Sequence, residues 1–250
     1  MTILVMRPFP DNQATANALR AAGYKALLSP ALRFEPVAVR DEPDVHYDAV
    51  IVTSANALRG IEGHALLERL RDKKVFAVGD ATAQAARAFG FANVESASGD
   101  AVALCELVEK RLRGSGRICY LAAADLSRDL GTDLGTRGYD VTTLTTYRMT
   151  PLPQFSEAVA AAFAAGEVEA VLHYSRRSAQ SFVGAVQAAG LEVSALAVPQ
   201  CCISDVVAAV LRDAGASQVL AAATPDESGV FEVLHRAIPL ERRAVKSGKG

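Results

Sequence analysis

The chain has 250 residues, of which 50% are hydrophobic and 22% are charged, and its formal net charge is −2. This composition is typical of a globular protein with a substantial core. The near-neutral charge excludes a general attraction to nucleic acid or to an anionic membrane. An acidic ligand would therefore have to be bound by a local arrangement of groups.

The opening sequence, MTILVMRP, lacks the basic start and the long apolar stretch of a secretory signal. No apolar run approaches the roughly 20 residues that are needed to span a bilayer. We therefore expect a cytoplasmic protein. Four cysteines, Cys105, Cys119, Cys201 and Cys202, form no CxxC pair, and with four scattered histidines they give no metal-ligand spacing. The adjacent Cys201 and Cys202 are interpreted as buried thiols.

Short apolar runs recur along the chain and predict strands. In chain order the predicted strands are 3–6, 25–29, 48–53, 75–78, 117–122, 140–145, 169–174, 201–203 and 218–222. Alanine-rich amphipathic segments, such as 80–90, 100–112 and 205–215, lie between them. This alternation predicts parallel sheets that are covered by helices on both faces.

The sequence also contains an internal repeat. Residues 78–94 align without gaps on 203–219, and residues 48–60 align on 169–181. A second unit repeats as well, because 1–30 and 117–145 both read as strand, helix, Gly-Tyr and strand. The four units, named A, B, A′ and B′ here, therefore follow one another at 1–30, 48–95, 117–145 and 169–222.

Each A and B pair would supply about five strands, enough for one open sheet. Sequential pairing, A with B and A′ with B′, would need one crossing near 100–115. Interleaved pairing, B with A′ and A with B′, would make 48–145 an insert with crossings at 31–40 and 145–153. Both of these stretches contain proline, which favours extended geometry before it. They favour interleaving and a two-stranded linker, although the repeat alone leaves both pairings open.

Small or hydroxylated residues follow four of the strands, at 53–56, 79–82, 174–178 and 203–205. Such residues cap helices. A helix start also leaves backbone N–H groups free and favours negative charge. In an open α/β sheet all four would lie at the carboxyl ends of the strands, where ligands bind. Two domains that faced each other across a hinge would thus suit a ligand with many carboxylates.

Competing motifs are missing from the sequence. It contains no GxGxxG after the first strand, no GxxxxGK[ST] and no GxSxG. The competing interpretations are a non-catalytic hinged two-domain binding module for a small polyanion and another flavodoxin-like enzyme that binds a nucleotide.

The ordered motifs resemble the uroporphyrinogen-III synthase family over about residues 1–235. They are LVMRP, DAVIVTSANALRG, VFAVGDATAQAARAFGF, SGDAVAL, ICYLAAAD, TYRM, AVLHYSRRSAQSF and CISDVVAAVL. The chain departs from the family at Met6, where threonine is frequent, and at Arg176, where proline is common.

The resemblance implies an α/β fold of two flavodoxin-like doubly wound parallel-sheet domains, joined by a two-stranded linker, with the second inserted in the first. We expect domain 1 to comprise 1–33 and 150–240, domain 2 to comprise 38–146, and 241–250 to be a disordered tail. The implied activity is cyclisation of hydroxymethylbilane, with loss of water and inversion of ring D, to uroporphyrinogen III. No cofactor, metal, nucleic acid or membrane is expected. We expect a monomer that receives its substrate from hydroxymethylbilane synthase.

The resemblance also suggests site residues. Tyr147 matches the linker tyrosine of the family and is the predicted general acid, with packing of the linker as the structural alternative. The predicted substrate-binding residues are Arg7, Thr53, Ser54, Asn56, Gly79, Thr82, Ser175, Arg176, Ser178 and Ser204. A structural ion pair is the alternative for Arg7, and simple capping is the alternative for the hydroxyl residues. His173, within a strand, is interpreted as a core histidine.

Overall fold

The computed structural model describes residues 1–40, 42, 44–113, 115–126 and 128–238, so the predicted tail at 241–250 lies outside the described residues. The chain divides into two compact units. The first unit combines Met1–Arg33 with the chain from Thr150 onward, and the second comprises Phe34–Met149. Each unit is described by itself below.

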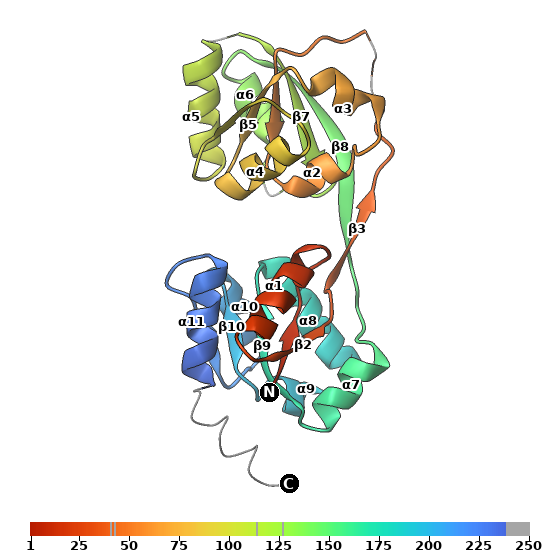
Figure 1. Cartoon of the computed structure of the whole chain (residues 1–250), viewed down its shortest axis with the longest axis vertical. Helices are drawn as coiled ribbons and strands as arrows, with labels where there is room; N and C mark the ends of the chain where they lie inside the picture. The colour runs from red at the N-terminus through yellow and green to blue at the C-terminus, as the bar shows by residue number, and fades with distance from the viewer. Residues whose placement is uncertain (41, 43, 114, 127, 239–250) are drawn as a thin grey trace. The chain divides into compact units, whose positions relative to one another are not determined.

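The first unit contains a five-stranded sheet (Figure 1). Its strands are β1 (Thr2–Val5), β2 (Lys25–Leu28), β9 (Val168–His173), β10 (Gln200–Cys202) and β11 (Val219–Ala221). Its helices are α1 (Asp11–Ala21), α7 (Glu157–Ala164), α8 (Arg176–Ala189), α9 (Glu192–Ala195), α10 (Asp205–Asp213) and α11 (Glu227–Ala237). All four strand pairs are parallel, and the spatial order is β11-β10-β9-β1-β2. This is the flavodoxin-like order 2-1-3-4-5.

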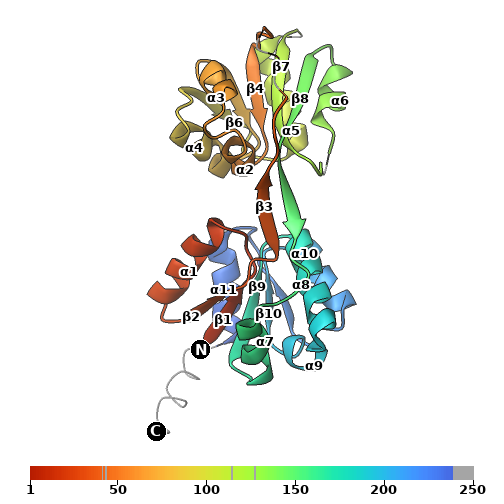
Figure 2. The same cartoon turned by 90° about the vertical axis from the view of Figure 1, so that its right-hand side faces the viewer.

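The second unit contains a six-stranded sheet in the order β3-β8-β7-β4-β5-β6. Its strands are β3 (Leu32–Pro36), β4 (Ala49–Val52), β5 (Lys74–Ala77), β6 (Asn93–Ser96), β7 (Arg117–Ala123) and β8 (Asp140–Pro151). Its helices are α2 (Ala55–Arg59), α3 (Ala65–Leu70), α4 (Asp80–Ala88), α5 (Ala101–Leu112) and α6 (Leu130–Gly135). The neighbours β3 and β8 run in opposite directions (Figure 2). Both boundaries between the units fall within these two strands, which form the predicted two-stranded linker.

The interleaved pairing of the repeat is confirmed. Strands β1 and β2 of unit A share a sheet with β9–β11 of unit B′, and β7 and β8 of A′ share a sheet with β4–β6 of B. Both sheets place their A-type strands and their B-type strands in the same spatial order. The inserted unit is therefore a circular permutation of the other. The sequence prediction omitted β6, which is the repeat equivalent of β11.

Helices cover both faces of each sheet, as the alternation predicted (Figures 1 and 2). In the second unit, side chains of α2, α3 and α4 pack on one face, and those of α5 and α6 pack on the other. In the first unit, α1 and α11 pack on one face. Strands with two covered faces must be apolar on both sides, which explains why β1 and β4 are buried at every residue.

Gly60 brings α2 against β8 more closely than any other residue would allow. A Cβ atom at Gly60 would lie 2.2 Å from the backbone oxygen of Thr146. The buried Thr146 hydroxyl also donates a hydrogen bond of 2.9 Å to the oxygen of Ala57 in α2. The glycine that ends the TSANALRG motif is thus required by packing.

We expect Gly60→Ala to destabilise the protein by about 2–3 kcal/mol, because the backbone oxygen of Thr146 cannot give way as a side chain could. The measurement is urea denaturation, followed by circular dichroism. The matched control is Gly184→Ala within α8, where an added Cβ meets nothing within 4 Å. This control should be neutral or slightly stabilising. Equal midpoints for the two variants would contradict the packing argument.

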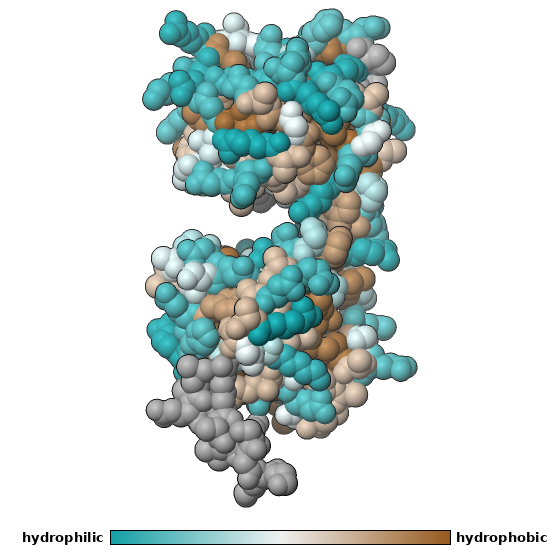
Figure 3. All heavy atoms as spheres, in the orientation of Figure 1, coloured by the Kyte–Doolittle hydropathy of each residue, from teal (hydrophilic) through white to brown (hydrophobic). Residues whose placement is uncertain are grey.

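The face of the chain drawn in Figure 3 is mostly hydrophilic. Among the residues that the structure describes, no helix combines the length and the apolar character that crossing a membrane would require.

Candidate functional site

The four predicted helix starts all occupy N-cap positions. Ser54 caps α2, Gly79 caps α4, Ser175 caps α8 and Ser204 caps α10. Because each follows a parallel strand, each lies at the carboxyl edge of its sheet. Ser54 and Ser175 cap their helices with side-chain hydrogen bonds, whereas the N-cap residues Gly79 and Ser204 make no such bond. The first-turn amides of α4 and α10 therefore remain available to an anionic group.

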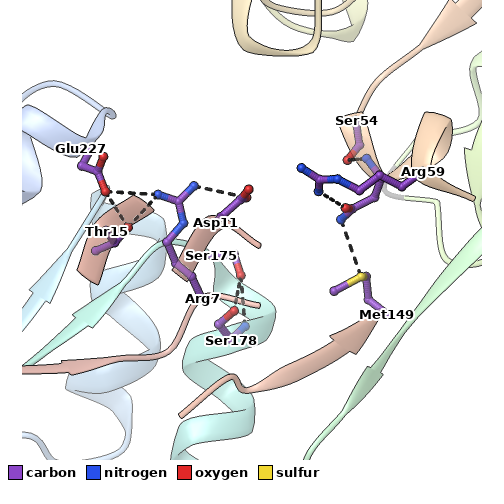
Figure 4. Close-up of polar contacts among 10 residues, drawn as sticks. Arg7, Asp11, Thr15, Ser54, Arg59, Met149, Ser175, Ser178 and Glu227 are labelled. Carbon is purple, nitrogen blue, oxygen red and sulfur yellow. Dashed lines mark hydrogen bonds and ion pairs between the residues drawn. The ribbon is translucent and has the colours of Figure 1, made fainter. Parts of the chain in front are cut away.

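Ser54 and Asn56 organise the start of α2, where Ser54 and Arg59 are labelled in Figure 4. The Ser54 hydroxyl accepts a 3.2 Å hydrogen bond from the Asn56 backbone N–H. The Asn56 amide oxygen accepts a hydrogen bond of 2.5 Å from Arg59, and its Nδ2 lies 3.7 Å from the sulfur of Met149 in β8. Asn56 therefore ties the helix start to β8.

Arg7 follows β1 and is held by two carboxylates (Figure 4). Its guanidinium lies 3.4 Å from Asp11 and 3.4 Å from Glu227, and it contacts the Thr15 hydroxyl at 3.3 Å. It also lies 4.3 Å from the centroid of the Tyr174 ring. The predicted alternative, a structural ion pair, is therefore present in the structure, and a substrate carboxylate would have to compete with both acidic partners.

Ser175 and Ser178 form a pair of neighbouring hydroxyl groups in the first unit. The Ser175 oxygen accepts a 3.1 Å hydrogen bond from the Ser178 backbone N–H, and the two hydroxyls lie 2.8 Å apart. Ser178 is buried, whereas Arg176 between them is exposed. Arg176 can thus reach a ligand at this edge, but Ser178 acts mainly within the helix start.

A pocket of about 330 Å³ opens at the carboxyl edge of the second unit's sheet. Three predicted residues, Thr53, Ser54 and Tyr147, meet in its lining. The remaining lining residues are Val78, Ala101, Tyr120, Ala123, Asp125, Leu126, Arg128 and Leu130. The pocket thus combines hydroxyl groups, one carboxylate, one guanidinium and an apolar wall.

A β-bulge places Tyr147 in this pocket. The register of β7 with β8 pairs Ala122 with Thr145 and then Ala123 with Tyr147, so that Thr146 is skipped. Both Thr146 and Tyr147 are consequently buried. Bulges re-aim side chains in this manner beside functional sites. The Tyr147 ring also stacks on Phe34 of β3, with centroids 5.7 Å apart, so the predicted packing role is present as well.

Tyr120 of β7 is a second phenol in the pocket. Burial raises its pKa above the ordinary value, while a hydrogen bond with Thr53 acts in the opposite direction. At neutral pH this phenol therefore stays protonated, and it can donate a hydrogen bond.

The structure does not bring all the predicted residues into one pocket. In the second unit, Asn56 of α2, Gly79 at the N-cap of α4 and Thr82 within α4 lie outside the lining of the pocket. Five residues belong to the first unit: Arg7, Ser175, Arg176, Ser178 and Ser204. Sequence reasoning missed Tyr120, Asp125, Leu126 and Arg128 of the pocket. The repeat could have indicated the loop after β7, because it corresponds to the loop after β1 that contains Arg7.

These features define a class of protein. The chain has two doubly wound parallel sheets of the same order, one inserted in the other, with polar helix starts at the carboxyl edges and no nucleotide-binding motif. It is similar to a mutant uroporphyrinogen III synthase from the extremely thermophilic bacterium Thermus thermophilus, with 20% identity, a TM-score of 0.56 and coverage of 99% of each chain. It is also similar to the uroporphyrinogen-III synthetase of Helicobacter pylori, with 18% identity and a TM-score of 0.66, over 94% of this chain and 98% of that one. These two likenesses support the fold.

The family model described as uroporphyrinogen-III synthase HemD matches residues 13–232. The chain belongs to the uroporphyrinogen-III synthase HemD family, whose members are cyclising lyases of haem biosynthesis that act on hydroxymethylbilane. A comparison with curated proteins gave no match.

Proposed function

We propose that this chain closes hydroxymethylbilane, with loss of water and inversion of ring D, to give uroporphyrinogen III. Family membership supports the reaction. The main observation that supports a role for particular residues is the pocket at the carboxyl edge of a doubly wound sheet, whose lining includes Tyr147, Thr53 and Ser54. Ligands bind at this edge in open α/β folds.

Tyr147 is the proposed general acid. Departure of the hydroxyl group leaves a delocalised electrophile at the methylene carbon, and protonation of the leaving oxygen by a phenol would assist this step. Ring D then attacks through its substituted carbon, and a spiro intermediate recloses with ring D inverted. Uncatalysed closure keeps ring D in its original orientation. The enzyme therefore has to position one ring carbon near the electrophile, which is catalysis by orientation.

The eight carboxylates of the substrate require many donors rather than a basic surface. We assign substrate contacts to Arg7, Thr53, Ser54, Asn56, Gly79, Thr82, Ser175, Arg176, Ser178 and Ser204. The uncapped starts of α4 and α10 support this assignment, because each helix start contributes about 0.3–1 kcal/mol toward an anion. The acidic partners of Arg7 make it the weakest member of the set.

The proposal is tested by supplying hydroxymethylbilane to the purified protein and separating the uroporphyrin isomers by chromatography after oxidation. We expect the type III isomer to exceed the type I isomer, which is the spontaneous product. Heat-denatured protein is the control. An isomer ratio equal to that of the spontaneous reaction would contradict the proposed enzymatic activity and would favour the alternative, a non-catalytic binding module.

We further propose that the protein is a cytoplasmic monomer that takes its substrate from hydroxymethylbilane synthase. All four cysteines are buried free thiols, which supports a reducing compartment. Sedimentation of the protein alone tests whether it is a monomer, and sedimentation with that synthase tests whether the two proteins associate. A stable dimer of this chain would contradict the proposed monomer.

A further inference from the structure

Exposed apolar side chains are concentrated at the carboxyl edges of the two sheets. Five large hydrophobic residues are exposed among the described residues: Phe9, Val102, Leu126, Val193 and Val206. Phe9 and Leu126 lie in the loops after β1 and β7, and Val102 and Val206 are the second residues of α5 and α10. All four of these positions follow a strand at its carboxyl end. Exposed hydrophobic residues that are scattered over a surface need no explanation, but four that gather at the carboxyl edges of the sheets do.

Phe9 and Leu126 lie in corresponding loops of the repeat. Each lies in the loop that joins the first A-type strand to the following helix, β1 to α1 and β7 to α6. In each sheet this strand adjoins the first B-type strand, β9 or β4, so the loop stands at the point where the strand order reverses. Ligands bind at this point in doubly wound folds. The two units therefore expose an apolar side chain at the same functional position.

The loop that bears Phe9 is held in place. Pro8 and Pro10 flank Phe9 and restrict the backbone. The Pro8 oxygen accepts a 3.2 Å hydrogen bond from the N–H of Asn12, and the Pro10 oxygen accepts one of 3.0 Å from Gln13. Phe9 itself is 68% exposed. An aromatic ring that is exposed on a restrained loop is already arranged for contact, so little conformational freedom is lost on binding.

We propose that Phe9 in the first unit, and its counterpart Leu126 in the second, each contact the face of a pyrrole ring of the tetrapyrrole. This inference rests on the proposed function. The polar helix starts can bind only the carboxylate arms of the ligand, and the flat apolar rings need a different partner. Aromatic faces stack on such rings. Leu126 lines the same pocket as Tyr147, where a ring would pack on its side chain.

Fluorescence gives a test that does not depend on turnover. The chain contains no tryptophan, so Phe9→Trp introduces a single reporter. The probe is uroporphyrinogen III under anaerobic reducing conditions, because its unconjugated rings do not absorb tryptophan emission and only contact changes the signal. We expect its addition to shift and quench the emission of Phe9→Trp. The control is Val193→Trp, in α9 before β10 and thus at the opposite edge, where Val193 is 90% exposed. Its emission should not change.

Kinetics gives the second test. We expect Phe9→Ser to raise KM for hydroxymethylbilane about tenfold with kcat changed less than about threefold, as loss of one stacking contact would. Leu126→Ser should raise KM about fivefold. Val193→Ser should leave both constants within about twofold of the wild type. Thermal melting followed by circular dichroism checks that every variant is folded.

The possible failures are distinguishable. A wild-type protein that produces no excess of type III isomer contradicts the proposed function. An active wild type, together with a Phe9→Ser variant whose KM is unchanged and a Phe9→Trp variant whose emission is unaffected by uroporphyrinogen III, overturns the ring contact alone.

Discussion

Replacement of Tyr147 by phenylalanine is expected to lower kcat for formation of the type III isomer by about 100-fold, with KM within about threefold of the wild type. The reason is that general acid catalysis contributes about 10²–10⁴-fold, while the ring and its packing remain. Stacking of the Tyr147 ring on Phe34 does not involve the phenol oxygen, so the variant should keep its fold. The measurement is the initial rate of type III formation across substrate concentrations, with the isomers resolved chromatographically.

Two further tyrosines make this experiment specific. Tyr139→Phe removes a phenol that is buried in the same unit but away from the pocket, and it should leave kcat unchanged. Tyr120→Phe removes the other phenol of the pocket and should lower kcat less than about tenfold. The reverse pattern, with a large loss for Tyr120→Phe and a small one for Tyr147→Phe, would assign the acid to Tyr120.

The second large effect concerns stability and arises from His173. This residue is fully buried in β9, where its Nε2 lies 2.9 Å from the Gln200 oxygen. The Gln200 amide donates both hydrogens, to the oxygens of Ala195 and Val198. Its oxygen must therefore accept from His173 Nε2–H, which leaves Nδ1 unprotonated. Nδ1 has no hydrogen-bond partner among the described residues.

Protonation of His173 would bury a charge beside the Phe182 ring, whose centroid lies 5.0 Å away. Burial accordingly lowers the pKa of His173 from 6.5 to about 4, and the hydrogen bond with Gln200 only partly opposes this. Between these values the unfolded chain binds the proton and the folded chain does not. The contribution of neutral His173 to the free energy of unfolding is therefore fully present above pH 6.5 and is lost progressively down to about pH 4. It amounts to about 3 kcal/mol.

We expect the free energy of unfolding, measured in urea from about pH 7 to about pH 4, to fall less steeply for His173→Gln than for the wild type. Other acidic groups titrate in this range, so the difference between the two proteins isolates His173. Exposed His46 supplies the control, since His46→Gln should keep the wild-type slope. Parallel curves for His173→Gln and the wild type would show that the histidine does not couple folding to pH.

Much of the fold was predictable because it depends on local pattern. Apolar runs followed by amphipathic segments identified most strands, and the repeat indicated that the units were equivalent. Strand β6 was missed because NVES contains only one strongly apolar residue, although its alignment with β11 could have revealed it. The four helix starts were predictable for the same local reason, since Ser and Gly at N-caps follow from backbone chemistry.

The candidate site was likewise predictable only in part. The sequence by itself determined the fold class and the capping residues, because each depends on patterns within one or two elements. It only favoured the interleaved order of the repeat units, which the strand order of the two sheets decided. Only the tertiary structure decided that Tyr147 reaches the pocket, because a bulge at Thr146 and the contact of Gly60 with β8 set its direction. Only the tertiary structure placed Asp11 and Glu227 on Arg7 and brought Leu126 and Arg128 to Tyr147. Apart from Arg7 and Asp11, which are four residues apart, these contacts join residues that are distant in the chain, and their geometry depends on packing rather than on local preference.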